Sequence, residues 1–326
     1  MQSLLKSRDK SALLGNLIPI CAALLLPAAF NGLGFGYGIT ISVFIFTYII
    51  AVSGLDILFG YSGQISLGHA AFYAIGAYGS VILSNRFNIP VGITMLISPV
   101  LAAVVGAVLA YPASRLVFHF LSLATIAFGE IVYQLSLQSP GGITGDAVGL
   151  PAKSINLFGL SLSTPSLKYY FGLAALIIFM LAKGSIIRSR VGRAFVAIRE
   201  NSHAAEGMGI NVRKYKIIAF AISAFYVAFA GAFYAHTWGY VSSEIALNRQ
   251  SVQFITILLF GGVASKWGPV LGAISVLVLN EALRSLENLQ VFVYGILLLI
   301  VILAIPGGVY GLFRDLVDKL RKKEVK

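Results

Sequence analysis

Long apolar runs follow one another along this chain of 326 residues, and they constrain its fold more than any other feature. They cover roughly residues 12–30, 38–59, 69–84, 91–111, 116–138, 168–187, 216–238, 250–265, 268–285 and 288–305. A helix needs about 20 mostly apolar residues to cross a bilayer. Charged residues make up only 11% of the chain, against about 25% in soluble domains. The sequence therefore predicts an all-α polytopic membrane protein with about ten transmembrane helices.

The positions of the basic residues predict the orientation. With an even number of spans, both termini lie on one side of the membrane. Six basic residues fall on the other side, namely Arg86, Lys153, Lys168, Lys183, Arg249 and Arg284, which leaves 18 of the 24 on the side of the termini. Because basic residues concentrate in cytoplasmic loops, both termini are expected to be cytoplasmic. Lys183 is expected to extend its ammonium toward the basic side.

The remaining segments predict one membrane domain over residues 1–326, without a separate soluble domain. The first apolar run lacks a clear cleavage site, so we expect a retained helix rather than a signal peptide. Cys21 lies inside that run and is expected to be a small buried hydrophobe. Residues 139–167 are predicted to form an external loop, and the basic residues 188–215 a cytoplasmic one.

Enzyme signatures are absent from the sequence. It has no phosphate-binding P-loop, no H-E-x-x-H, no Cys-x-x-Cys and no G-x-S-x-G elbow. The four histidines, His69, His119, His203 and His236, do not have the spacing of metal ligands. We therefore expect a protein that is not an enzyme and that binds neither a metal nor a cofactor of its own.

The segment "GYSGQISLGHAAFYAIGAYGS", residues 60–80, is unusual for a spanning helix because it combines five glycines with polar side chains. Gly60, Gly63 and Gly68 are expected to break the chain at the cytoplasmic end of the second span. The next helix is expected to start near Ser66–His69, with free N–H groups that favour an anionic group such as a carboxylate. The predicted gate or substrate pathway comprises Gly63, Gln64, Ser66, Gly68, His69 and Phe72; the alternative is a hinge or lining that never contacts substrate.

Charged residues inside apolar runs are functional candidates because burial in a membrane is costly. His119 and Glu130, eleven residues apart, share a helix stripe with Gln134, which we expect to face the bundle or a cavity. Glu130 is assigned to the pathway, with a structural hydrogen-bonding role as the alternative. Asp56 is expected to pair with a donor for structural reasons. Glu281 and Arg284 are expected to form a local ion pair.

The cytoplasmic stretch "IRENSHAAEGMGI" predicts a short helix. Asn201 or Ser202 can cap its start, and Gly207 and Gly209 can end it. Two adjacent alanines would let this helix dock closely into a groove of a partner protein. A solvated loop whose arginines bind lipid headgroups is the alternative.

Several motifs resemble one transporter family. "SRVGRAFVAIRENSHAAEGMGINVRKYKIIAF" resembles the ATPase-docking loop of ATP-binding-cassette importer permeases, and more narrowly that of branched-chain amino acid permeases of the LivM type. "GYSGQISLGHAAFYAIGAY", "LATIAFGEIV", "TGDAVGLP" and "LFGGVASKWGPVLGA" resemble further signatures of that family, in order, between about residues 40 and 310. The chain departs from the usual family pattern at Asp56, Tyr133, Ser243 and Ala264, where asparagine, a basic residue, proline and glycine are more common.

The resemblance implies a permease of the bacterial cytoplasmic (inner) membrane that translocates branched-chain or similar small amino acids. Its implied partners are a second related permease, two ATPase subunits that use ATP, an extracellular or periplasmic binding protein and membrane lipid, but no nucleic acid. The coupling residues it implies are Glu200, Ala204, Ala205, Glu206 and Gly209. Alternatives are a permease for urea, short amides or a sugar, and an ion-coupled secondary transporter; a membrane enzyme is the weakest.

Overall fold

Helices make up most of the structure, a computed structural model that describes residues 23–30, 32, 34, 36–113, 118–157, 160–284, 289, 292–293, 295–296, 299 and 308–312. The long elements are α2 (Gly36–Asp56), α3 (His69–Arg86), α4 (Val91–Ala113), α5 (Phe118–Gln138), α6 (Pro165–Arg188), α7 (Arg190–Glu200), α8 (Ser202–Gly207), α9 (Val212–Trp238), α10 (Asn248–Gly261) and α11 (Gly268–Ala282). Short helical turns are η1 (Ile57–Tyr61), η2 (Pro140–Gly142), η3 (Asp146–Val148) and η4 (Ser243–Ala246). Strands β1 (Leu150–Pro151) and β4 (Tyr240–Val241) pair antiparallel, as do β2 (Asn156–Leu157) and β3 (Leu160–Ser161).

Five helices in the described part are long and apolar enough to cross a membrane, which supports the polytopic class. They are Gly36–Tyr61, Val91–Pro112, Phe120–Gln138, Pro165–Arg188 and Val212–Trp238. Three further predicted runs form the shorter helices α3, α10 and α11. Most of the run 12–30 and most of the run 288–305 lie outside the described residues. The total of ten spans and the cytoplasmic termini stay predictions.

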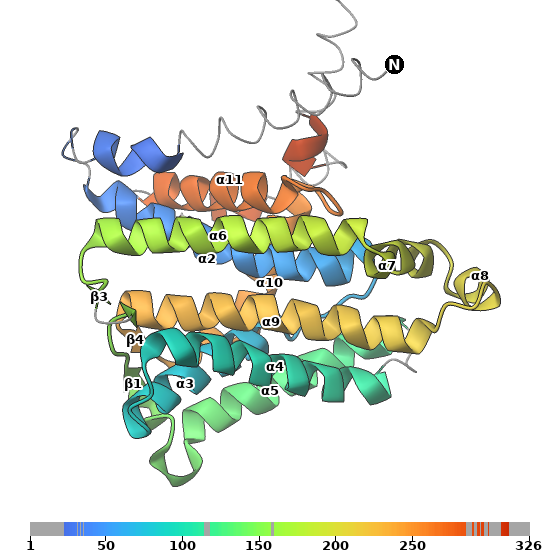
Figure 1. Ribbon diagram of the computed structural model, residues 1–326, viewed down its shortest axis with the longest axis horizontal. Coiled ribbons are helices and arrows are strands. Elements are labelled where there is room, and N and C mark those ends of the chain that lie inside the picture. The colour runs from blue at the N-terminus through green and yellow to red at the C-terminus, as the bar shows by residue number, and fades with distance from the viewer. Residues whose placement is uncertain are drawn as a thin grey trace, which may run out of the picture.

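The helices lie roughly parallel, with α9 packed against α2, α3 and α4 (Figure 1). Glycines permit the closest approaches: a Cβ at Gly76 would collide with the backbone of Ala228, and one at Gly231 with that of Tyr73. Such small-residue contacts hold helices together where lipid removes the hydrophobic driving force between them. Helices α7 and α8 project at one end of the bundle, whereas β1 and β4 lie at the other (Figure 1). The two hydrophilic loops are thus at opposite ends.

Candidate functional site

The second span breaks where the glycines predict it. Helix α2 continues into the π-helical turn η1, whose wider ring is closed by a bond from Ser62 N to Ile57 O (3.2 Å). The chain then leaves helical geometry, with φ of +69° at Gly63, a conformation that suits glycine. Helix α3 starts at His69, which confirms the predicted start near Ser66–His69.

The broken segment returns into the bundle before α3 begins. His69 Nε2 lies 2.8 Å from Ser223 Oγ. Ser223 is eleven residues beyond the start of α9 at Val212, which is about 16 Å along a helix. The start of α3 therefore lies near half-depth, and the predicted position at the cytoplasmic mouth is wrong.

The N-terminus of α3 is occupied by hydroxyl groups. Ala70 N donates to Ser251 Oγ (2.8 Å), and just before the helix Leu67 N donates to Thr125 Oγ1 (3.0 Å). A Cβ at Gly68 would collide with the Thr125 carbonyl, so this segment packs directly on α5. The prediction that free N–H groups here would receive an anion is wrong at Ala70, because the Ser251 hydroxyl already satisfies that donor.

The polar side chains of the broken segment are buried and paired. Gln64 Nε2 donates to Ser62 Oγ (2.8 Å) and to Lys216 O (3.2 Å). His69 Nδ1 lies 2.8 Å from Ser66 Oγ, and its ring packs against that of Phe72 with centroids 5.7 Å apart. The structure therefore brings six predicted pathway residues into one packed segment, whose polar side chains bond to one another and to Lys216 and Ser223 of α9.

Glu130 lies apart from that element. Its side chain is exposed, and its Oε1 accepts a hydrogen bond from Gln134 Nε2 (2.7 Å). The inner face of α5 is taken by Thr125, which bonds to Leu67, and by Gly129, which packs toward Gly68. Glu130 therefore does not face the described helices of this chain, and its predicted position beside a cavity stays a prediction. The side chain of His119 lies outside the described part of the structure.

The projecting segment forms the predicted short helix. Asn201 Oδ1 accepts bonds from His203 N and Ala204 N (both 3.0 Å) and so caps α8. Gly209 follows with φ of +84°.

The predicted docking residues do not share one face. Ala205 is buried, at 3% exposure, whereas Glu200, Ala204, Glu206 and Gly209 are exposed. The expectation of an outward pair of alanines is therefore wrong for Ala205. Met208 is a large apolar residue with 85% exposure that was not selected from the sequence. Its position between two glycines could have indicated that its side chain is exposed.

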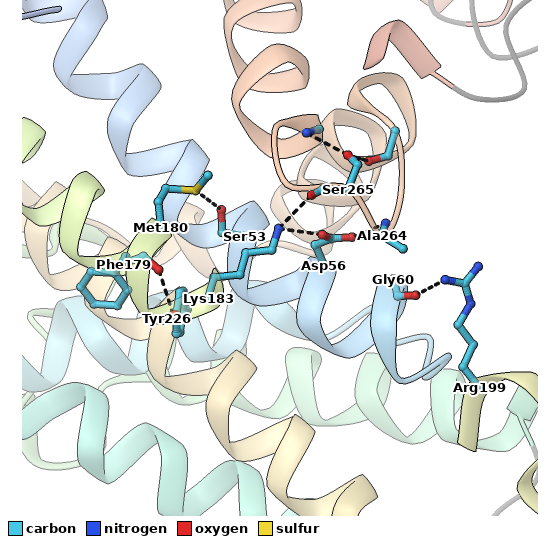
Figure 2. Close-up of polar contacts among 12 residues, drawn as sticks. Ser53, Asp56, Gly60, Phe179, Met180, Lys183, Arg199, Tyr226, Ala264 and Ser265 are labelled. Atoms are coloured by element: carbon cyan, nitrogen blue, oxygen red, sulfur yellow. Dashed lines mark hydrogen bonds and ion pairs between the residues drawn. The ribbon is translucent and has the colours of Figure 1, made fainter. Parts of the chain in front are cut away.

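Arg199 joins the projecting segment to the broken span. Its guanidinium donates to the carbonyl oxygen of Gly60 in η1 (Figure 2). A Cβ placed at Gly63 would lie 3.4 Å from both Cα and Cβ of Arg199, so the two backbones are in close contact. From the sequence, Arg199 appeared only as one of many basic cytoplasmic residues.

A buried ion pair closes the same end of the second span. Lys183 Nζ lies 2.7 Å from Asp56 Oδ2, and both side chains are almost wholly inaccessible (Figure 2). Asp56 Oδ1 also accepts a bond from Ala264 N (2.7 Å), and Lys183 donates to Ser265 O (3.3 Å). The pair links α2, α6 and the turn before α11. It confirms a structural partner for Asp56. The expectation that the Lys183 ammonium extends to the membrane surface on the basic side is wrong, because the buried carboxylate binds it.

The expected local pair at the end of α11 is confirmed. Arg284 Nη1 lies 3.3 Å from Glu281 Oε1, and both side chains are exposed. Among the described residues, no cluster of three or more histidine, cysteine, aspartate or glutamate side chains could hold a metal ion.

Comparisons with known proteins identify the family. A family model described as "Branched-chain amino acid transport system / permease component" matches residues 38–302. The high-affinity branched-chain amino acid transport system permease protein LivM of Escherichia coli K12 is 31% identical, over 82% of this chain and 68% of that protein. The corresponding protein LivH of Salmonella typhimurium LT2 is 27% identical, over 81% and 91%. The autoinducer 2 import system permease protein LsrC of Enterobacter sp. strain 638 is 25% identical, over 84% and 78%.

No solved structure matches the chain. The family match confirms the resemblance found in the sequence motifs and establishes a transport subunit rather than an enzyme. This chain, in which Arg199 ties a projecting helical segment to a broken span, belongs to the family of permease components of branched-chain amino acid transport systems.

Proposed function

We propose that this chain is the translocating subunit of an ATP-driven importer for branched-chain or similar small amino acids in the bacterial inner membrane. It pairs with a second related permease, as the relatives named LivM and LivH suggest. Two ATPase subunits dock at its cytoplasmic end and use ATP, and a binding protein delivers substrate from outside. The chain itself binds no cofactor. The contact between Arg199 and Gly60 carries this proposal, because it connects the docking segment to the break in the second span.

The docking surface comprises the exposed residues Glu200, Ala204, Glu206 and Gly209. Ala205 supports it from the buried side, where its carbonyl accepts a bond from Ile210 N (3.0 Å). Met208 adds an exposed apolar group that an ATPase groove can bury. A helix with one small outward residue and a capped start presents a rigid surface to a partner.

The broken segment acts as the gate, through Gly63, Gln64, Ser66, Gly68, His69 and Phe72. These residues are packed and internally hydrogen-bonded, which suits an element that moves as a body better than one that binds substrate. Glu130, exposed on α5, lines the pathway on the side that the second permease covers.

Force from the ATPases passes through α8 and α7 to the gate. When the docked helix shifts, Arg199 pulls on the η1 carbonyl while the Asp56–Lys183 pair holds the end of α2 to α6. The pull is then concentrated on residues 62–68, where the helix is interrupted. A discrete shift of a packed element of this kind is an established mode of conformational switching.

Reconstitution tests the proposal. The chain is purified with its partner permease and ATPases, placed in vesicles, and supplied with ATP and the binding protein. We expect uptake of leucine, isoleucine and valine that stops without ATP, and no uptake of urea, acetamide or ribose. Uptake that follows a sodium or proton gradient without ATP would refute the importer function, and ATP-driven uptake of urea or ribose alone would refute the substrate class.

A further inference from the structure

An apolar groove lies between α6 and α11, with α2 as its floor. Helix α2 packs against both of the others, and Figure 1 shows the three together on one side of the bundle. The groove has a volume of about 460 Å³, which is within the range of small-molecule sites, about 300–1,000 Å³. Its walls include Ile45, Ile49, Leu173, Ile177, Val270 and Ile274. It is therefore large enough to hold a ligand, and its walls are mainly hydrocarbon.

The walls of the groove do not suit the polar ends of an amino acid. Their two hydroxyl groups already donate to backbone carbonyls, Ser42 Oγ to Gly38 O (2.8 Å) and the Tyr169 hydroxyl to Ala23 O (2.7 Å). Along α2 and α6, a bound carboxylate would therefore meet no available side-chain donor among the described residues that line the groove. Because burying a polar group without a partner is costly, this part of the groove favours a hydrocarbon chain.

Polar groups gather at one end of the groove, where the turn before α11 supplies Lys266 and Trp267. The Lys266 side chain is exposed, and its Nζ lies 5.3 Å from the centroid of the Trp267 ring. Among the described residues that line the groove, Lys266 is the only charged one. The groove is thus apolar along its length and positive at one end, which is complementary to an amphiphile with an anionic headgroup.

The positive end of the groove lies near the end of a membrane-crossing helix. The residue before Lys266 is Ser265, whose carbonyl accepts a bond from Lys183 Nζ of α6 (3.3 Å). Lys183 is five residues before the end of α6 at Arg188, which is about 8 Å along a helix. Helix α6 is long and apolar enough to cross a membrane. Lys266 and Trp267 therefore lie at the level where lysine and tryptophan side chains meet lipid headgroups.

The groove has about the length of one leaflet of a bilayer. Its lining residues on α6 extend from Tyr169 to Leu181, which are twelve residues apart, or about 18 Å along a helix. One leaflet contributes half of the hydrocarbon core, about 15 Å. A lipid whose headgroup lies at Lys266 can therefore place an acyl chain along the whole groove.

We propose that this groove binds one acyl chain of an anionic phospholipid, whose phosphate contacts Lys266 and Trp267. Lipid tails elsewhere in the bilayer are as apolar as the groove, so the tail fixes the position of the lipid and the charge determines which lipid is retained. The attraction of one lysine for an anionic lipid surface corresponds to a preference of about fivefold. The site is separate from the proposed gate and docking surface, so it does not depend on the proposed transport function.

Tryptophan fluorescence tests the site, because Trp267 lines the groove and Trp238 is the only other tryptophan of the chain. The full chain with Trp238→Phe is placed in phosphatidylcholine vesicles that contain a small fraction of brominated phosphatidylglycerol or, separately, of brominated phosphatidylcholine. Bromine quenches the fluorescence of a tryptophan that it contacts. We expect phosphatidylglycerol to bind about fivefold more tightly than phosphatidylcholine. Equal quenching by the two lipids would overturn the proposal, and a groove covered by another segment of the chain would give that result.

Variants of Lys266 test the headgroup contact. Lys266→Gln should abolish the preference for phosphatidylglycerol, and Lys266→Arg should retain it. The matched control is Arg284→Gln, which removes an exposed positive charge beyond the other end of α11 and should leave the preference unchanged. A preference that survives in Lys266→Gln would overturn the proposal, because another group would then select the lipid.

Two neighbouring residues of α6 test whether the acyl chain occupies the groove. Ile177→Phe places a larger side chain in the groove and should lower quenching by brominated phosphatidylglycerol severalfold. Ile178→Phe, on the outer face of α6 with 64% exposure, is the control and should be quenched as strongly as the parent protein. Equal quenching in the two variants would overturn the proposal, because the lipid would then lie on the outer surface of the protein.

Discussion

Removal of Lys183 is expected to destabilise the protein strongly, because it leaves a buried carboxylate without its counter-ion. The two side chains are 2% and 0% exposed, and the charged atoms lie 2.7 Å apart. At an effective dielectric constant of about 20, two unit charges at this separation attract each other by about 6 kcal/mol. Part of that is recovered when Asp56 relaxes or takes up a proton, so Lys183→Met should lower the free energy of unfolding by about 3–5 kcal/mol.

A double-mutant cycle separates this pair from its surroundings. Asp56→Asn keeps an oxygen that can accept the bond from Ala264 N, so Asp56→Asn/Lys183→Met should lie within about 1.5 kcal/mol of wild type. Lys168→Met is a control on the same helix; its ammonium is half-exposed and bonds a neutral carbonyl, that of Thr237, so its cost should stay below about 1.5 kcal/mol.

The assay is unfolding by sodium dodecyl sulfate in mixed micelles, followed by circular dichroism and by trypsin cleavage. The cycle should give a coupling energy of at least about 2 kcal/mol between positions 56 and 183. A Lys183→Met protein as stable as wild type, or a double variant no more stable than Lys183→Met alone, would refute the reasoning.

Three further variants test the coupling and pathway residues. Arg199→Ala should lower uptake per ATP hydrolysed by about tenfold. The control Arg193→Ala should not, because among the contacts described its guanidinium bonds only the nearby Arg188 carbonyl. Equal uptake per ATP in the two variants would show that Arg199 takes no part in coupling. Ala205→Leu should overpack α8 by about 1–3 kcal/mol and weaken co-purification of the ATPases, and full retention would argue against a buried supporting role. Glu130→Gln should still bond Gln134 but transport more slowly in vesicle uptake; unchanged uptake would place Glu130 outside the pathway.

The helices and the break could be predicted because both depend on local properties of the sequence. Apolar runs of spanning length gave helix positions that the structure matches at α4, α5 and α9 within a few residues. The glycine-rich stretch predicted the interruption after α2, since glycine weakens a helix wherever its neighbours lie. The cap at Asn201 was equally local, because its side chain bonds backbone groups two and three residues ahead.

How deep a residue lies in the bundle, and which way its side chain points, could not be predicted, because both depend on neighbours distant in the sequence. The start of α3 was expected at the mouth, but the contact of His69 with Ser223, 154 positions away, places it inside. Counting charges also could not show that the first turn of α10 lies beside the start of α3, which the bond between Ser251 and Ala70 reveals. Helical periodicity gave the stripe that carries Glu130 but not which side of α5 packs on this chain.

The hydrogen bond from Arg199 to Gly60, on which the proposed coupling depends, could not be predicted from a sequence motif because its acceptor is a backbone carbonyl. In an α-helix, the Gly60 carbonyl would accept a bond from the amide four residues on, that of Gln64. The π-helical turn redirects Gln64 N to Leu58 O (3.1 Å), which leaves the Gly60 oxygen available to Arg199. The same irregularity that breaks the second span therefore creates the acceptor that the docking segment uses. The proposed gate and its hydrogen bond to Arg199 therefore depend on the same local departure from α-helical geometry. A change that restored a regular helix through residues 57–64 would abolish both.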